Sequence, residues 1–317
     1  MNLLLAGQLD ADERAQWLAE LARALPGHRL LAARGELPDD AVDAAIVANP
    51  PPGSLQGLPR LRLIQSLWAG VDRLLADPTL PAGVPIARMV DPAMNAAMAE
   101  TALWAVLALH RGFFDYQRQQ RAGLWRPLPQ RRADECPVTV LGFGQMGRTA
   151  AARLAQQGYP VTAWRRSAPT VVADPAPAGV RLCHGADGLA AALPGAQVLV
   201  NLLPLTPDTR GLLDAATLAR LPRGAGLVNL ARGAHVVDAD LRAALDAGRV
   251  GHAVLDVFHA EPLPAGHPFW QHPRVTVLPH AAAQTDARSA AAVAAANIEA
   301  LAGGRPLAHL VARDAGY

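Results

Sequence analysis

The sequence predicts an α/β protein made of two doubly wound parallel sheets, and three observations support this prediction. Short apolar segments of strand length alternate with helical patterns along almost the whole chain, which implies crossover connections and parallel sheets covered on both faces. A glycine-rich turn at 142–147 joins one of these strands to the helix that follows it. The length of 317 residues is sufficient for two domains.

The first series of elements is defined by short apolar runs. The runs NLLLAG, AAIVAN and LRLIQS are typical of buried strands, because each is short and apolar. A longer helical pattern is apolar up to Leu109, and the proline- and arginine-rich piece after it is typical of a loop. We therefore expect strands at 2–7, 44–49 and 61–66, helices at 12–25 and 93–120, and a loop at 126–137.

A second series of strands and helices begins with VTVLGFG. Between two of its strands lies the helical pattern DADLRAALDAG, for which we expect Asp238 as the N-cap and Gly248 as the stop. An alanine-rich helix over 286–302 follows the last strand. The expected strands of this series are 138–144, 161–164, 197–203, 226–231, 252–258 and 274–278.

Composition excludes several kinds of function. All 29 basic side chains are arginine, because the sequence contains no lysine, and this rules out a lysine Schiff base, a phosphate-binding lysine of the Walker type and a lysine general base. The net charge is only +2 and the arginines are scattered, so nucleic acid is not an expected partner. Cys136 and Cys183 are too few for a disulfide framework, which favours a reducing compartment.

The sequence also gives expectations for location and metal binding. The apolar stretch TALWAVLAL (101–109) has about half the length that a bilayer requires. The N-terminus reads as a first strand, not as a signal peptide. We therefore expect a cytoplasmic protein that binds no membrane, and we assign no metal site.

The glycine turn has the spacing and the context of a dinucleotide-binding site. Gly142, Gly144 and Gly147 give the pattern G-x-G-x-x-G directly after a strand and at the opening of a helix. The first glycine permits a tight turn, the second lets the backbone approach a pyrophosphate, and the third packs the helix against the strand. The helix N-terminus then binds the phosphates. The alternative is a turn with a purely structural role.

Two cations stand where many dinucleotide-binding chains have one carboxylate. Arg165, Arg166 and Ser167 lie about twenty residues beyond the glycine turn, at the end of the next strand. An acid there would bind the ribose hydroxyls and repel a 2′-phosphate, whereas arginine pairs with phosphate through two parallel charge-assisted hydrogen bonds. The pair therefore predicts NADP(H), with NAD(H) as the second choice. The alternative is that both arginines are ordinary surface residues.

Four chemically reactive residues follow the later strands of the second series. Arg232 follows GLVNLA, Asp256 and Glu261 end and follow HAVLDVF, and His280 follows RVTVL. Because ligands bind beyond the carboxyl ends of strands in open α/β sheets, we expect all four on the edge that carries the glycine turn. Nearby histidines such as His235 do not end a strand in this way, and we interpret them as surface or packing residues.

An arginine, a histidine and a carboxylate beside a nicotinamide suit the reduction of a carbonyl group. The Arg232 guanidinium would bind a substrate carboxylate and polarise the adjacent carbonyl. His280 would protonate the carbonyl oxygen, and Glu261 would orient the imidazole and favour its charged form. Each residue also has a simpler interpretation: His280 as a loop histidine, Arg232 as a cation that contacts a helix, and Glu261 as an N-cap before Pro262.

Together these segments resemble the D-isomer-specific 2-hydroxyacid dehydrogenase family. The similar segments are LLPLTPDTRGLL (202–213), NLARG (229–233), LDVFHAEPLP (255–264) and WQHPRVTVLPH (270–280), in the family's order. The longer NLARGAHVVDADLRAALDAGRV and the closing VARDAGY resemble in particular the bacterial glyoxylate/hydroxypyruvate reductases of the A type, which prefer NADPH. Alanines follow His280, where many members have glycines, and we interpret them as typical of this subgroup.

The resemblance implies two Rossmann-like domains with a cleft between them: a substrate domain over 1–100 plus 286–317, and a dinucleotide-binding domain over 101–285. It implies that Arg232, Glu261 and His280 are catalytic and that Asp256 holds the nicotinamide carboxamide. The remaining cofactor contacts that it implies are Met98, Gln145, Met146, Leu203, Pro204 and Ala231. The implied substrate contacts are Trp68, Ala69, Gly70, Val71, Arg232, His280 and, from a neighbouring subunit of a homodimer, Trp125.

The resemblance therefore implies NADPH-dependent reduction of small 2-keto acids, glyoxylate to glycolate and hydroxypyruvate to D-glycerate. Two alternatives remain open from the residues. One is a dehydrogenase of the same fold for another acid, such as a bulkier 2-keto acid, phosphite or formate. The other is a non-catalytic member of the family that senses NADP(H).

Overall fold

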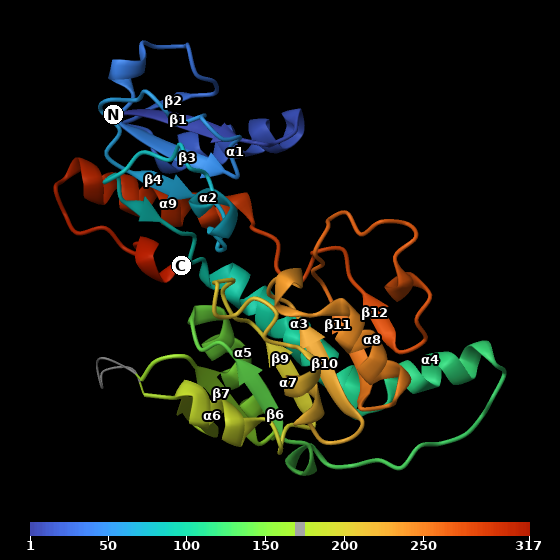
Figure 1. Ribbon diagram of the computed structural model, residues 1–317. Helices are drawn as coiled ribbons and strands as arrows, with labels where there is room; N and C mark the ends of the chain where they lie inside the picture. The colour runs from blue at the N-terminus through green and yellow to red at the C-terminus, as the bar shows by residue number, and fades with distance from the viewer. Residues whose placement is uncertain (169–174) are drawn as a thin grey trace. The chain divides into compact units, whose positions relative to one another are not determined.

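The structure, a computed structural model, describes residues 1–168 and 175–317 and divides into two compact units. Unit 1 contains Met1–Met94 and Thr285–Tyr317, and unit 2 contains Asn95–Gln284. Each unit has its own parallel sheet with helices packed on it (Figure 1). The predicted fold class, α/β with two parallel sheets, is confirmed.

Unit 1 contains a five-stranded sheet in the order β2-β1-β3-β4-β5. Helix α1 packs against α9, and α1 begins with a capping box in which Asp10 Oδ1 accepts a hydrogen bond from Glu13 N at 2.8 Å. The strands are β1 (Asn2–Gly7), β2 (Arg29–Leu31), β3 (Ala44–Ala48), β4 (Ile64–Ser66) and β5 (Ile86–Ala87). The helices are α1 (Ala11–Ala24), α2 (Asp72–Leu75) and α9 (Ala287–Ala302).

Unit 2 contains a seven-stranded sheet in the order β12-β11-β10-β9-β6-β7-β8. The strands are β6 (Val138–Leu141), β7 (Val161–Arg165), β8 (Val180–His184), β9 (Val198–Asn201), β10 (Ala225–Asn229), β11 (Val250–Leu255) and β12 (Val275–Val277). The helices are α3 (Pro92–His110), within which the division between the units falls, α4 (Phe113–Arg121), α5 (Gln145–Gln156), α6 (Gly185–Ala192), α7 (Ala215–Ala219) and α8 (Asp238–Asp246). Short 3₁₀ helices cover Asp39–Ala41, Ala133–Glu135, Gly233–His235, Pro268–Trp270 and Arg313–Ala315.

The unit 2 sheet is buried on both faces, which explains why its strands are apolar at consecutive positions. In β9, Val200 packs into a core shared with α3 and α5, whereas the preceding Leu199 packs into a core shared with α7 and α8. All neighbouring strands of this sheet run parallel. Their carboxyl ends therefore lie at one edge, where the predicted site residues follow the strands.

The structure corrects several sequence predictions. The single helix expected over 93–120 is two helices, because Gly112 adopts a left-handed conformation with φ of 69° between them. Asp238 is the first residue of α8 and not its N-cap, a position that Val237 occupies without a side-chain hydrogen bond. Gly248, with φ of 65°, follows the end of α8 as predicted. The short edge strands β2, β5 and β8 were not predicted.

Helix α3 is longer than the apolar stretch on which the membrane prediction rested. With 19 residues, it is long and apolar enough to cross a membrane by length and composition alone. Several of its side chains, among them Met98, Ala102 and Val106, lie in the core of unit 2. A core helix of a soluble protein passes the same test, so this helix is only a weak indication of a membrane segment.

Candidate active site

The glycine turn leaves one open side at the start of α5. Gly142 has φ of 96°, and a Cβ atom on it would lie 2.6 Å from the carbonyl oxygen of Leu202. A Cβ atom on Gly147 would lie 1.9 Å from the carbonyl oxygen of Gly142, so the helix packs tightly on the turn. Gly144 is the N-cap of α5, and a Cβ atom there would meet nothing within 4 Å. This cradle fits the pyrophosphate of a dinucleotide.

The two arginines lie beside the glycine turn. The amide of the first glycine donates a hydrogen bond to the carbonyl oxygen of Trp164 at 2.9 Å, and Arg165, the last residue of β7, comes next. Arg166 and Ser167 are exposed, and Arg166 Nη1 lies 3.1 Å from Asp208 Oδ2. Two cations at the end of the strand that neighbours the turn fit a further phosphate group.

His280 and Glu261 form a direct hydrogen-bonded pair. His280 Nδ1 lies 2.7 Å from Glu261 Oε2. The other carboxylate oxygen, Oε1, accepts a hydrogen bond from the backbone amide of Phe258 at 2.8 Å, so both oxygens of Glu261 have a partner. His280 itself has φ of 55°, a conformation that is uncommon for a residue other than glycine and that occurs often at functional sites.

Asp256 hydrogen-bonds the backbone of the turn that contains His280. Its buried carboxylate accepts hydrogen bonds from the amides of Ala281 at 2.7 Å and Ala282 at 3.1 Å. Its carbonyl oxygen accepts one from the amide of His280 at 2.9 Å. Burial raises the pKa of the Asp256 carboxyl group, and the two amide hydrogen bonds oppose that rise. This role is additional to the contact with the nicotinamide carboxamide that the family resemblance implies for Asp256.

Arg232 lies in a loop that packs against the loop that contains Glu261. It follows β10, whose neighbour in the sheet is β11, and Nη1 donates to the carbonyl oxygen of Ala231 at 2.8 Å. A Cβ atom on the next residue, Gly233, would lie 2.0 Å from the carbonyl carbon of Phe258. The structure therefore brings the backbones that carry Arg232 and Glu261 into direct contact at one edge of the sheet.

Three buried polar residues behind this loop were missed as functional residues. Asn201 and Asn229 are the last residues of β9 and β10, and His235 is fully buried. Asn229 Nδ2 donates to the carbonyl oxygen of Arg232 at 3.0 Å, and Asn229 Oδ1 accepts from the amide of Ala231 at 3.3 Å. The sequence did contain a signal for this network, because each of two apolar strands ends in an asparagine. A buried side-chain amide needs hydrogen-bond partners, so these two positions indicate a buried polar network.

The remaining predicted residues of unit 2 differ in exposure. Met98 is 7% exposed and lies in the core, and Leu203 and Ala231 are also buried. Trp125 is 98% exposed. Half-buried Pro204 and Met146 and exposed Gln145 complete this set.

The predicted substrate loop belongs to unit 1, where it follows β4. Ser66 Oγ accepts a hydrogen bond from the amide of Trp68 at 3.0 Å, which fixes the start of the loop. Ala69 and Gly70 are half-buried, and Val71 is buried. The loop is therefore anchored at both ends within unit 1.

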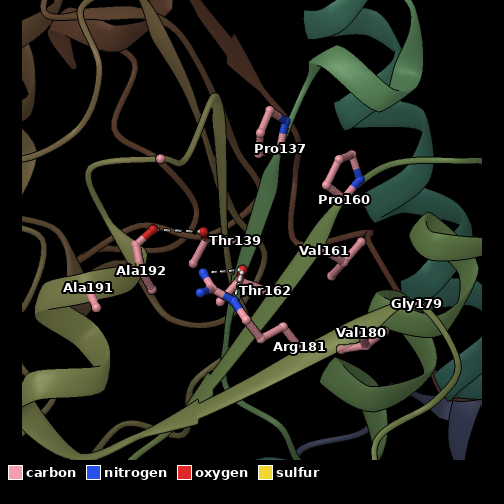
Figure 2. A pocket seen from close by; sticks show the side chains of 11 residues that line it. Pro137, Thr139, Pro160, Val161, Thr162, Gly179, Val180, Arg181, Ala191 and Ala192 are labelled. Atoms are coloured by element: carbon pink, nitrogen blue, oxygen red, sulfur yellow. Dashed lines mark hydrogen bonds between the residues drawn. The ribbon is translucent and has the colours of Figure 1, made fainter.

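A separate hollow of about 600 Å³ lies at the opposite ends of the strands in unit 2 (Figure 2). Its lining includes Thr139, Thr162 and Arg181, from the beginnings of β6, β7 and β8. The Arg181 guanidinium donates to Thr162 Oγ1 there. Arg232, Glu261 and His280 follow the carboxyl ends of their strands, so this hollow is not part of their site. Within 1–168 and 175–317, no group of three or more His, Cys, Asp or Glu side chains could hold a metal ion.

Comparison with known proteins decides the family. The model of the D-isomer specific 2-hydroxyacid dehydrogenase, NAD binding domain, matches residues 103–282, more than half of the chain. The chain belongs to the D-isomer specific 2-hydroxyacid dehydrogenase family. The family predicted from the sequence is thereby confirmed.

Several relatives of this 2-hydroxyacid dehydrogenase match it along nearly its whole length. A glyoxylate/hydroxypyruvate reductase A from Serratia proteamaculans is 43% identical over 308 residues, which cover 95% of this chain and 96% of that protein. A D-isomer specific 2-hydroxyacid dehydrogenase from Xanthobacter autotrophicus Py2, solved with NADPH and MES, is 39% identical with a TM-score of 0.93 over 99% of both chains. An NADPH-dependent glyoxylate/hydroxypyruvate reductase from Sinorhizobium meliloti, solved with NADP and sulfate, is 35% identical with a TM-score of 0.90 over 100% of this chain and 99% of that one. This dehydrogenase is therefore an NAD(P)-dependent oxidoreductase, as predicted.

Proposed function

We propose that this dehydrogenase reduces small 2-keto acids with NADPH, glyoxylate to glycolate and hydroxypyruvate to D-glycerate. The observation that carries the proposal is the 2.7 Å pair of His280 and Glu261, at the sheet edge where Arg232 follows a neighbouring strand. The names of the relatives from Serratia proteamaculans and Sinorhizobium meliloti support the same substrates.

The cofactor of this proposal is NADP(H), with NAD(H) as a weaker alternative. Gly142, Gly144 and Gly147 would receive the pyrophosphate at the start of α5. Arg165, Arg166 and Ser167 would bind the 2′-phosphate, where Arg166 exchanges the Asp208 carboxylate for the phosphate. The remaining proposed contacts are Met98, Gln145, Met146, Leu203, Pro204, Ala231 and Asp256. Relatives solved with NADPH and with NADP support this choice.

The reduction assigns one task to each catalytic residue. When bound, the reduced nicotinamide supplies the hydride that adds to the carbonyl carbon. Arg232 binds the substrate carboxylate and polarises the carbonyl group. His280 gives its Nε2 proton to the carbonyl oxygen, which receives the electron pair of the broken C–O π bond. The other ring proton remains on Nδ1 and is donated to Glu261 Oε2 throughout. The imidazole ends neutral, and the product is a 2-hydroxy acid.

Further assignments belong to the same proposal. Residues 1–100 plus 286–317 form the substrate domain, and 101–285 form the dinucleotide-binding domain. Backbone amides of Ala69, Gly70 and Val71 receive the substrate carboxylate, next to Trp68. The protein is a cytoplasmic homodimer that binds no membrane, and the exposed Trp125 reaches the site of the neighbouring subunit.

Steady-state kinetics test this function. We expect the highest kcat/KM with NADPH and glyoxylate or hydroxypyruvate in a panel that also contains bulkier 2-keto acids, and the reverse reactions with phosphite and formate. A clear preference for NADH would contradict the cofactor assignment, and a preference for phosphite, formate or a bulkier acid would contradict the substrate assignment. Binding of NADPH without turnover of any of these compounds would favour a sensing protein. Light scattering of the wild type and of Trp125→Ala tests the dimer.

A further inference from the structure

A chain of buried hydrogen bonds connects the loop after β9 with the loop that carries Arg232. His235 Nε2 lies 3.2 Å from the carbonyl oxygen of Pro204, and His235 Nδ1 lies 3.0 Å from Asn201 Nδ2. Asn201 Nδ2 also donates to Asn229 Oδ1 at 2.9 Å. Asn229 Nδ2 in turn donates to the carbonyl oxygen of Arg232. Asn201, Asn229 and His235 are all fully buried.

The hydrogen bonds among these described residues fit one arrangement of donors and acceptors. Asn201 Oδ1 accepts from the amide of Leu203, so the Asn201 amide group cannot turn over without placing an oxygen against Asn229 Oδ1. Both hydrogens of Asn201 Nδ2 are then donated, one to Asn229 and one to His235 Nδ1. His235 Nδ1 therefore accepts from Asn201, which places the ring proton on Nε2, where it is donated to the carbonyl oxygen of Pro204.

We propose that His235 and Asn201 are positioning residues for Arg232. His235 Nδ1 orients the Asn201 amide, Asn201 orients the Asn229 amide, and Asn229 holds the backbone of Ala231 and Arg232. The inference rests on the proposed function, because the task of Arg232 is to bind the keto acid. It gives a part in the reaction to His235, which was expected to be a surface or packing residue.

The consequence concerns the keto acid more than the cofactor. Without the imidazole, one hydrogen of Asn201 Nδ2 has no acceptor, which weakens the buried network that holds the Asn229 amide and the Arg232 peptide. The carbonyl oxygen of Pro204 keeps a second donor, the hydroxyl of Thr209 at 2.8 Å. We therefore expect the loop after β9 to stay ordered when His235 is replaced.

Kinetics of three variants test the proposal. In His235→Leu we expect kcat/KM for the keto acid to fall by about tenfold or more, in line with a lost buried hydrogen bond, while the Kd of NADPH changes by less than about threefold. His235→Gln offers an amide that accepts from Asn201 and donates to Pro204, and it should recover most of the activity. His252→Leu is the matched control, because His252 is another buried histidine of unit 2, in β11, where it hydrogen-bonds Thr276 and stacks on Phe114.

The kinetic result overturns the proposal if His235→Leu loses no more kcat/KM than His252→Leu at a temperature where both are folded. It is also overturned if His235→Gln is no more active than His235→Leu. Should His235→Leu fail to fold, the comparison of wild type, His235→Gln and Asn201→Ala replaces it. In that comparison we expect kcat/KM of Asn201→Ala to fall by about tenfold or more. Full activity of Asn201→Ala would contradict the proposal.

A second readout does not depend on activity. In ¹⁵N–¹H spectra of the wild type with labelled histidine, the His235 proton should sit on Nε2 with Nδ1 bare at neutral pH, and a proton on Nδ1 would refute the arrangement. A crystal structure of the His235→Leu variant should show Asn229 Nδ2 moved away from the carbonyl oxygen of Arg232. A wild type that reduces no keto acid would refute the proposed function alone, since the spectra and the structure still test the positioning.

Discussion

Gly233 and Phe258 approach so closely that a Cβ atom on Gly233 would lie 2.0 Å from the carbonyl carbon of Phe258. Gly233 directly follows Arg232, and the amide of Phe258 donates to Glu261. This contact therefore fixes the spacing between the backbones of two proposed catalytic residues. It requires a glycine because the neighbouring atoms belong to backbone, which cannot move aside as a flexible side chain can.

We expect Gly233→Ala to damage both stability and activity. Overpacking of this kind costs about 1–3 kcal/mol of unfolding free energy, and a displacement of the two loops by about 1 Å can lower kcat/KM by about 10²-fold. Urea unfolding and steady-state kinetics measure the two effects. Gly266→Ala, in the loop that carries Phe258 and Glu261, is the control, because a Cβ atom there would meet nothing within 4 Å. Equal behaviour of the two variants would contradict the role given to the contact.

Replacement of Glu261 by glutamine should separate proton donation from binding. The amide side chain of the Glu261→Gln variant can still accept from the amide of Phe258, but it no longer offers a carboxylate to His280 Nδ1. We expect kcat to fall by about 10²-fold, within the range for general acid catalysis, while the Kd of NADPH is unchanged. His280→Ala should lose at least as much. Wild-type kcat in Glu261→Gln would show that the pair does not act in catalysis.

Asp256→Ala should disorder the turn that carries His280. Its carboxylate accepts hydrogen bonds from the amides of Ala281 and Ala282, and its removal leaves the buried Ala282 amide unsatisfied, at a cost of about 1–3 kcal/mol. We expect lower stability together with a large loss of kcat. The side chain of Asp256→Asn can still accept one of the two amide hydrogens. This variant should therefore be intermediate in both the free energy of unfolding, measured in urea, and kcat, measured by steady-state kinetics. An alanine variant with normal kcat would be inconsistent with this positioning.

Arg166→Ala should weaken NADP⁺ binding selectively. A charge-assisted hydrogen bond contributes about 1.5–3 kcal/mol, so we expect the Kd of NADP⁺ to rise by about ten- to a hundredfold, and that of NAD⁺ by much less. Fluorescence titration measures both constants. Arg181→Ala is the control, because it removes an exposed arginine at the other end of these strands (Figure 2). A parallel loss of affinity for both cofactors would argue against a 2′-phosphate contact.

Stability should depend on pH through His252. Burial, followed by the positive charge of Arg118, lowers the pKa of His252 from 6.5 to about 4 in the folded protein. The folded state therefore keeps this ring neutral while the unfolded chain takes up a proton, so stability is complete above pH 6.5 and falls as the pH drops toward 4. At about 1.4 kcal/mol per pKa unit the group accounts for about 3 kcal/mol. Urea unfolding of wild type and His252→Gln across this range should show a flatter pH dependence in the variant.

Much of the fold could be predicted because its signals are local. The strand β6, the turn at Gly142 and the helix α5 follow from an apolar run, a glycine spacing and a helical pattern that all lie within residues 138–156. The strands β2, β5 and β8 were missed because edge strands are short or half-exposed and so lack a continuous apolar run. The helix break at Gly112 was also missed, because a glycine inside a helical pattern does not by itself show whether the helix continues.

The sequence by itself determined the fold class, the glycine turn, the two arginines and the residue types at the strand ends, since each depends on neighbours along the chain. Only the tertiary structure decided which of these residues meet, because the order β12-β11-β10-β9 brings together the ends of strands that are separated in sequence. The 2.7 Å pair of His280 and Glu261, the two amides on Asp256 and the buried network around Asn201 all depend on that order. Hydrogen bonds require atoms at about 3 Å in the correct orientation, and no spacing along a chain specifies such a distance between separate strands.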